Sequence, residues 1–223
     1  MASHTASETP PLDHDAVIWS VPPQDRAGRP LLVLLHGYGA DERDLWDLSS
    51  YMPDSFVIAA VRAPLSPPWP APGYSWYPIE GLAARDTARV TAAATRFIQW
   101  LDEAADAESI GLLGFSQGAA VALQALRVEP ERFAFVVNLS GYVAPGPMPT
   151  DLELAERRPP VFWGRGTHDE VIPEVLVAHT TEWLPAHAEL SGRVYPGLAH
   201  GVSTEEIADV RVFLEKRCAE AST

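Results

Sequence analysis

The residue pattern with the clearest chemical meaning surrounds Ser116. The segment Gly114-Phe115-Ser116-Gln117-Gly118 places a glycine two positions before and two positions after the serine. An apolar, β-type run precedes this segment and the helix-prone residues 119–123 follow it, which predicts a tight strand-to-helix turn. A serine on such a turn has a strained backbone and a projecting hydroxyl, so it can act as a nucleophile. The alternative is a glycine-rich turn with an incidental serine.

A nucleophilic serine needs two partners. Near neutral pH its hydroxyl requires a neutral imidazole to accept the proton and a carboxylate to orient that imidazole. When the serine lies on a turn of this kind, the acid follows a late strand and the histidine follows the last strand. Asp169 and His200 meet these requirements, with Glu170 as the immediate rival acid. We favour Asp169 because the acid in the familiar form of this turn stands three residues before an Ile or Val that precedes a proline, here Ile172.

Seven histidines compete for the role of base. His168 adjoins the candidate acid but precedes the last predicted strand. His36 follows an early strand, where structural support of a loop is its expected role. The remaining rivals have polar or terminal surroundings or fall within a predicted helix: His4, His14, His187 and His179. His200 is therefore the predicted base.

Acyl transfer also needs hydrogen-bond donors for the oxyanion, and backbone N–H groups are sufficient. The residue after the nucleophile, Gln117, offers one N–H group at the start of the predicted helix. The turn His36-Gly37-Tyr38-Gly39, which follows an early strand, is well placed to offer the second.

Short apolar runs alternate with helical stretches along the chain, which predicts an α/β fold with a mostly parallel sheet covered on both faces. Helices are clearest at 86–105 and 204–217, and Ser203 and Glu206 have the spacing of a capping box. The strands are expected at 16–21, 31–36, 56–61, 109–115, 133–138, 160–165 and 190–196.

The segment 64–78 interrupts this alternation. It is rich in proline and aromatic residues, which makes it a stiff loop. Such a loop is either a surface excursion packed over the sheet or one wall of a substrate pocket. We expect residues 16–223 to form a single domain without a separate lid, preceded by a flexible segment, 1–15.

Composition excludes several other functions. The 223 residues carry a formal charge of −14, with 16 Lys and Arg against 30 Asp and Glu, which argues against a nucleic-acid partner. Cys218 is the single cysteine, and no motif for zinc, a phosphate loop or a dinucleotide occurs, so no metal or cofactor is expected. With no signal peptide and no apolar run of membrane-spanning length, we expect a cytoplasmic protein without stable membrane insertion.

Several motifs together resemble the phospholipase/carboxylesterase family, which includes small bacterial carboxylesterases and acyl-protein thioesterases. The resemblance begins near Leu31 and extends to the C-terminus, and Phe-Ser-Gln-Gly after a strand is its most specific part. The other motifs are Leu35-His36-Gly37-Tyr38-Gly39, Arg62-Ala63-Pro64, Ser75-Trp76-Tyr77, the Asp169 turn and Gly197-Leu198-Ala199-His200.

This resemblance implies an α/β-hydrolase fold and a Ser116–Asp169–His200 triad. It also implies an oxyanion hole formed by the N–H groups of Tyr38 and Gln117, and it is compatible with a homodimer. It places Trp76 near the acyl pocket, and we expect Leu65 and Tyr77 of the same loop to contact the substrate too.

The predicted reaction is hydrolysis of short- to medium-chain carboxylic esters, which are small-molecule substrates, through an acyl-enzyme. Thioester or lysophospholipid hydrolysis by the same triad is the alternative, since a thioester passes through the same tetrahedral oxyanion. A non-catalytic ligand-binding module on this fold is the hypothesis of another class.

Overall fold

The computed structural model describes residues 9–79 and 86–221. Within these residues, one seven-stranded sheet has the strand order β1-β3-β2-β4-β5-β6-β7. Strand β1 is antiparallel to β3, and every other neighbouring pair is parallel. The strands are β1 (Val17–Trp19), β2 (Leu31–Leu35), β3 (Val57–Val61), β4 (Ile110–Phe115), β5 (Phe135–Leu139), β6 (Pro160–Gly166) and β7 (Glu189–Tyr195). All seven predicted strands are thus confirmed, with shifts of one or two residues at their ends.

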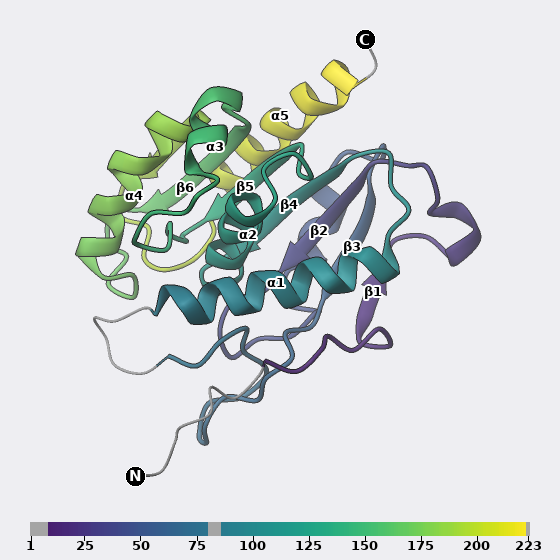
Figure 1. Ribbon diagram of the computed structural model, residues 1–223, viewed down its shortest axis with the longest axis horizontal. Helices are drawn as coiled ribbons and strands as arrows, with labels where there is room; N and C mark the ends of the chain where they lie inside the picture. Colours follow the sequence, from purple (N-terminus) through teal and green to yellow (C-terminus); the bar gives the residue numbers. More distant parts are fainter. Residues whose placement is uncertain (1–8, 80–85, 222–223) are drawn as a thin grey trace.

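Helices connect the parallel strands. Figure 1 shows α1 and α2 lying across one face of the sheet, and α5 packs against the opposite face together with the 3-10 helix η2. The helices are η1 (Pro23–Asp25), η2 (Trp46–Tyr51), α1 (Thr87–Ala104), α2 (Gln117–Val128), α3 (Asp151–Arg157), α4 (Glu174–His187) and α5 (Thr204–Ala221). The α/β fold, with helices on both faces of a mostly parallel sheet and no separate lid domain evident, is therefore confirmed for the described residues.

The apolar strands explain why both faces are covered. In β2, Leu31, Val33 and Leu35 join the core on the α1 and α2 side. Leu32 and Leu34 join the core on the α5 side. Successive side chains of a strand point to opposite faces, so a continuous apolar run needs a helical layer on each side.

The ends of two helices bear on the sequence predictions. Helix α1 begins after Asp86, whose carboxylate accepts a hydrogen bond from the Ala88 N–H at 2.9 Å. At α5 the Ser203 hydroxyl accepts from the Glu206 N–H at 3.1 Å, which is one half of a capping box. The other half, a bond from the Ser203 N–H to the Glu206 carboxyl, is not formed with normal geometry: the Glu206 side chain is buried, and among the described residues its oxygens have no hydrogen-bond partner.

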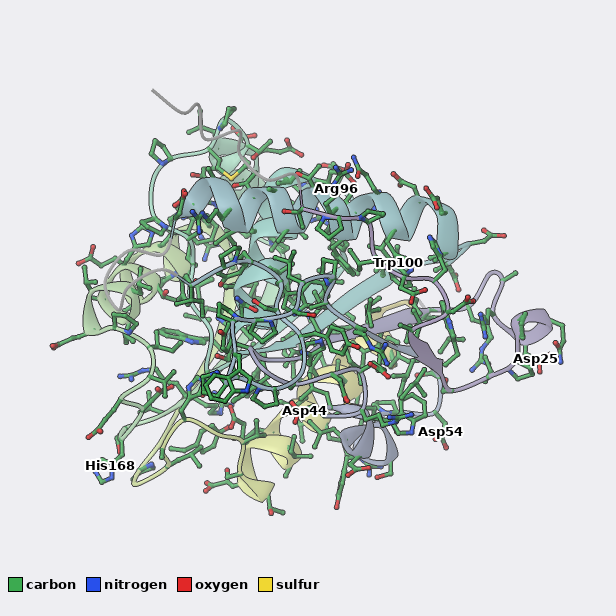
Figure 2. The ribbon with its side chains drawn as sticks, turned by 90° about the horizontal axis from the view of Figure 1, so that it is seen from below. Asp25, Asp44, Asp54, Arg96, Trp100 and His168 are labelled. Atoms are coloured by element: carbon green, nitrogen blue, oxygen red, sulfur yellow. The ribbon has the colours of Figure 1, made fainter. Side chains whose placement is uncertain are left out.

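The first eight residues of the predicted flexible segment lie outside the described residues. Beyond them, Leu12 is buried in the core beneath α1, and the Thr9 carbonyl accepts from Arg96 Nε at 2.7 Å. Figure 2 labels Arg96 on α1. No described helix is both long and apolar enough to cross a membrane.

Candidate active site

Ser116 lies between the last residue of β4 and the first residue of α2. Its backbone has φ 52° and ψ −113°, a conformation that L-residues rarely adopt. The turn is tight: a Cβ at Gly114 would lie 2.4 Å from the Ala119 nitrogen, and one at Gly118 would lie 2.1 Å from the Leu35 oxygen. Glycine is therefore required on both sides of the serine.

His200 follows β7, as the sequence predicted, and its ring lies between Ser116 and Asp169. Nε2 is 2.8 Å from the Ser116 hydroxyl oxygen, and Nδ1 is 2.8 Å from Asp169 Oδ2. The imidazole also packs on Phe115, with ring centroids 5.0 Å apart. The ring is thus held in line between a hydroxyl and a carboxylate.

The turn after β6 orients Asp169. Its Oδ1 accepts hydrogen bonds from the Val171 N–H at 3.0 Å and the Ile172 N–H at 3.2 Å, which leaves Oδ2 to face His200. Only 3% of the Asp169 side chain is exposed, whereas the neighbouring Glu170 is exposed. The structure therefore brings Asp169, and not Glu170, to the histidine.

Two of the six histidines that competed with His200, His168 and His36, lie away from the Ser116 hydroxyl. His168 is exposed, and Figure 2 shows it at the periphery of the molecule. His36 is buried, its Nε2 accepts from the Ala63 N–H at 3.0 Å, and its Nδ1 is 2.7 Å from the Gly37 oxygen. Since an N–H group can only donate, the proton of His36 must be on Nδ1. Burial lowers the pKa of His36, which favours this neutral, loop-supporting form.

The two predicted oxyanion segments flank the serine. Gln117 is the first residue of α2, and the Gly37 turn is close enough that a Cβ at Gly37 would lie 3.6 Å from the Ser116 Cβ. Among the described residues, the backbone N–H groups of Tyr38 and Gln117 donate to no protein acceptor. Both segments therefore lie beside the nucleophile, and an oxyanion hole formed by these two N–H groups stays a prediction.

The aromatic loop is anchored deeply at its C-terminal end. Trp76 is fully buried and donates its indole N–H to the His36 carbonyl at 2.9 Å, and the Tyr77 hydroxyl is 2.6 Å from that of Tyr142. Leu65 is half-buried, and Trp69 is 92% exposed. Of the three predicted substrate contacts, Leu65 is therefore the most accessible, and contact between these residues and a substrate stays a prediction.

An ion pair beside the Gly37 turn was not anticipated from the sequence. Arg62 donates two hydrogen bonds of 2.6 Å to Glu42, which is 5% exposed, and the guanidinium lies over the Tyr74 ring at 4.6 Å. Hydrogen bonds from Arg62 lower the pKa of Glu42, so the carboxylate stays charged. The two residues are 20 positions apart in the chain, and no local pattern links them.

Chemically, the hydrogen-bonded series of hydroxyl, imidazole and carboxylate can activate the Ser116 hydroxyl as a nucleophile. Among the described residues, no group of three or more His, Cys, Asp or Glu side chains could hold a metal ion. The fold and the converging serine, histidine and aspartate define a serine hydrolase of the α/β-hydrolase class.

Comparison with known proteins specifies the family. A family model described as Phospholipase/Carboxylesterase matches residues 17–218, and the chain belongs to this family. Esterase YpfH of Escherichia coli K12 is 25% identical over 207 residues, which cover 88% of this chain and 85% of the relative.

Two further similar proteins are a yeast thioesterase and a bacterial carboxylesterase of known structure. Acyl-protein thioesterase 1 of Saccharomyces cerevisiae is 31% identical over 122 residues, which cover 53% of this chain and 54% of the yeast protein. The match thus spans about half the length of that relative. The crystal structure of the Bacillus cereus carboxylesterase aligns with a TM-score of 0.75 and 20% identity, covering 90% of this chain and 93% of that one. At that identity, the structural match supports the fold alone.

Proposed function

We propose that this protein hydrolyses short- to medium-chain carboxylic esters through an acyl-enzyme formed on Ser116. The observation that carries the proposal is the continuous hydrogen-bonded chain from the Ser116 hydroxyl through His200 to Asp169, with 2.8 Å at both links. The names of the relatives, an esterase and a thioesterase among them, support the same class of reaction.

In the acylation step, His200 Nε2 accepts the hydroxyl proton while Ser116 Oγ attacks the ester carbonyl carbon. The carbonyl oxygen becomes an oxyanion, and the N–H groups of Tyr38 and Gln117 are the proposed donors to it. One such donor is worth about 3–4 kcal/mol in the transition state. His200 then gives its proton to the departing alcohol, which leaves an acyl group on Ser116.

Deacylation repeats these steps with water as the nucleophile. His200 takes a proton from water, the hydroxide oxygen attacks the acyl carbon, and the proton returns to Ser116 Oγ as the acid leaves. Asp169 keeps the proton of the neutral ring on Nδ1 and stabilises the imidazolium that forms. Its two backbone hydrogen bonds hold the carboxylate in place for both halves of the reaction.

Thioester hydrolysis is the second candidate, because the same triad would serve it and one relative is named a thioesterase. The net charge of −14 opposes polyanionic acyl donors such as acyl-coenzyme A. Rates on p-nitrophenyl esters of increasing chain length, measured beside the matching thioesters, separate the two activities. We expect higher kcat/KM on the short and medium esters, and the reverse order would favour the thioesterase.

A fluorophosphonate probe tests the catalytic serine itself. We expect one covalent adduct on Ser116 by mass spectrometry, and we expect Ser116→Ala to lose both the adduct and turnover, by about 10⁵-fold or more. Circular dichroism provides the control that the variant is folded. An unlabelled wild-type protein that still binds esters would instead indicate a binding module.

A further inference from the structure

The side-chain amide of Gln117 is buried and fully engaged with the aromatic loop. Its oxygen accepts a hydrogen bond from the backbone N–H of Trp76 at 2.8 Å, and its nitrogen donates one to the Tyr77 carbonyl at 2.7 Å. The Ser75 hydroxyl lies 3.3 Å from both amide atoms and donates to the Tyr77 carbonyl at 2.8 Å. Gln117 is 3% exposed, so these contacts form without competition from water.

A second tether holds the same segment from the other side. The Trp76 indole N–H donates to the carbonyl of His36, the residue before Gly37. The segment 75–77 is therefore attached to both of the strand ends that supply the proposed oxyanion donors. These two attachments link the position of this segment to the positions of both strand ends.

We propose that the Gln117 side chain is a positioning residue that couples the aromatic loop to the oxyanion hole. This inference rests on the proposed function, since it concerns the N–H donors of Tyr38 and Gln117. Removing the amide leaves the Trp76 N–H and the Tyr77 carbonyl buried without their partner, and the loop must move to regain hydrogen bonds. A displacement of about 1 Å at a positioned donor is enough to lower a rate by about 10²-fold.

The coupling extends to substrate selection. Leu65 and Ser75 form a two-way backbone pair, with N···O distances of 3.1 and 2.8 Å. Gln117 thus also fixes Leu65, the most accessible of the proposed acyl contacts. Loss of the Gln117 amide should therefore affect long acyl chains more than acetyl esters, because only the longer chains reach the loop.

The test replaces the amide while keeping the backbone. Gln117→Met retains the size of the side chain and the Gln117 N–H, so a lost donor is not the explanation for a lower rate. We expect kcat on p-nitrophenyl acetate to fall about 10- to 100-fold with KM changed less than threefold. We also expect a larger loss on the octanoate ester.

Gln124→Met is the matched control on the same helix. Gln124 is fully buried and donates to Thr91 Oγ1 at 2.8 Å, and within residues 9–79 and 86–221 none of its hydrogen bonds reaches the aromatic loop. We expect this variant to lose stability while kcat and the acetate-to-octanoate ratio stay within twofold of wild type. A purely structural role for Gln117 would make the two variants alike.

Gln117→Glu provides a conservative rescue. A protonated carboxyl accepts from the Trp76 N–H and donates to the Tyr77 carbonyl as the amide does, and burial favours this neutral form. Relative to wild type at each pH, we expect kcat within about threefold at pH 6.5 and a progressive loss by pH 9, as ionisation places a negative charge against the carbonyl.

The outcomes separate the two proposals. Amide hydrogen exchange at Trp76 should be faster in Gln117→Met than in Gln124→Met whether or not the protein is an esterase. If the wild type neither turns over esters nor reacts with the fluorophosphonate, the proposed function fails. With an active wild type, three results would each overturn the positioning role. The first is a Gln117→Met variant that keeps the wild-type kcat, and the second is a Gln124→Met variant whose kcat falls as much as that of Gln117→Met. The third is a kcat of Gln117→Glu, relative to wild type, that does not change with pH.

Discussion

Asp169 and Glu206 are two buried carboxyl groups, one before and one after the His200 loop in the chain. Their hydrogen-bonding environments are opposite. Asp169 receives two backbone N–H groups and the His200 ring. Glu206 is fully buried, and no hydrogen bond reaches either of its oxygens within the described residues. Its Oε1 atom instead packs against Gly164: a Cβ built on Gly164 would lie only 2.0 Å from it.

The comparison shows that packing surrounds one buried carboxyl with hydrogen-bond donors and leaves the other without them. At Asp169, two backbone N–H groups hold Oδ1, and Oδ2 faces the imidazole. Burial raises the pKa of Glu206 to about 7. The Ser203 backbone N–H, which makes no hydrogen bond of normal geometry with this carboxyl, lowers the pKa only in part, and the nearby Asp209 raises it further. Glu206 thus packs between α5, which follows the His200 loop, and β6, which leads to Asp169, and it keeps its proton below about pH 7.

Replacing Asp169 by Asn should produce the largest effect. The amide NH₂ group would face the Nδ1–H of His200 and favour the wrong tautomer, so we expect kcat/KM to fall about 10³- to 10⁴-fold. The measurement is steady-state hydrolysis of p-nitrophenyl acetate, with thermal unfolding as a check on the fold.

Glu170→Gln is the matched control, because Glu170 is exposed and adjoins Asp169 in the chain. We expect its kcat/KM to stay within twofold of wild type. A collapse of activity in Glu170→Gln, with Asp169→Asn active, would reverse the assignment of the acid.

The ionisation of Glu206 should have an intermediate effect, which is a dependence of the free energy of unfolding on pH. Its pKa is about 7 in the folded protein against an ordinary 4.5, so the folded state holds the proton more tightly. The contribution of Glu206 to the free energy of unfolding is therefore highest below about pH 4.5, falls as pH rises, and is lost above about pH 7. The difference amounts to about 3 kcal/mol.

Glu206→Gln removes this titration. Urea unfolding at pH 5 and pH 8 should show a smaller loss of stability between the two pH values in Glu206→Gln than in wild type, by about 2 kcal/mol. Glu205→Gln, at the exposed neighbouring position, should behave like wild type. Equal pH dependence in Glu206→Gln and wild type would show that Glu206 is ionised throughout this range.

The smallest expected effect concerns the contact between Gly164 and Glu206. Gly164→Ala places a methyl group against Glu206 Oε1 and near Phe162 Cε1, so we expect a loss of about 1–3 kcal/mol. Combining it with Glu206→Ala should recover about 1 kcal/mol in a double-mutant cycle, because the clash with the carboxyl is removed. Additive losses would place the strain at Phe162 instead.

Local patterns predicted much of the site. Strict glycine spacing around Ser116 indicated the strained turn, because those glycines are required by contacts within a few residues and with the adjacent strand. The positions of Asp169 and His200 after the sixth and seventh strands followed from the order of the elements. The choice of Asp169 over Glu170 depended on a familiar turn, which the structure explains through the N–H groups of Val171 and Ile172.

Other features had no local signal. The partners of the Gln117 side chain are 40 to 42 positions away in the chain, so the sequence indicated only the role of its N–H group. At Glu206 the spacing predicted a capping carboxylate, but contact with Gly164 competes with that role and buries the group.

The sequence by itself determined the order of strands and helices, the turn at Ser116 and the types of side chain available for chemistry, because these depend on local backbone preference and on apolar periodicity. Only the tertiary structure decided that Asp169 is paired with the histidine, that burial raises the pKa of Glu206, and that the Gln117 amide is hydrogen-bonded to the aromatic loop. Charge state and hydrogen bonding in a buried site depend on donors brought from distant parts of the chain, and packing alone determines where those donors lie.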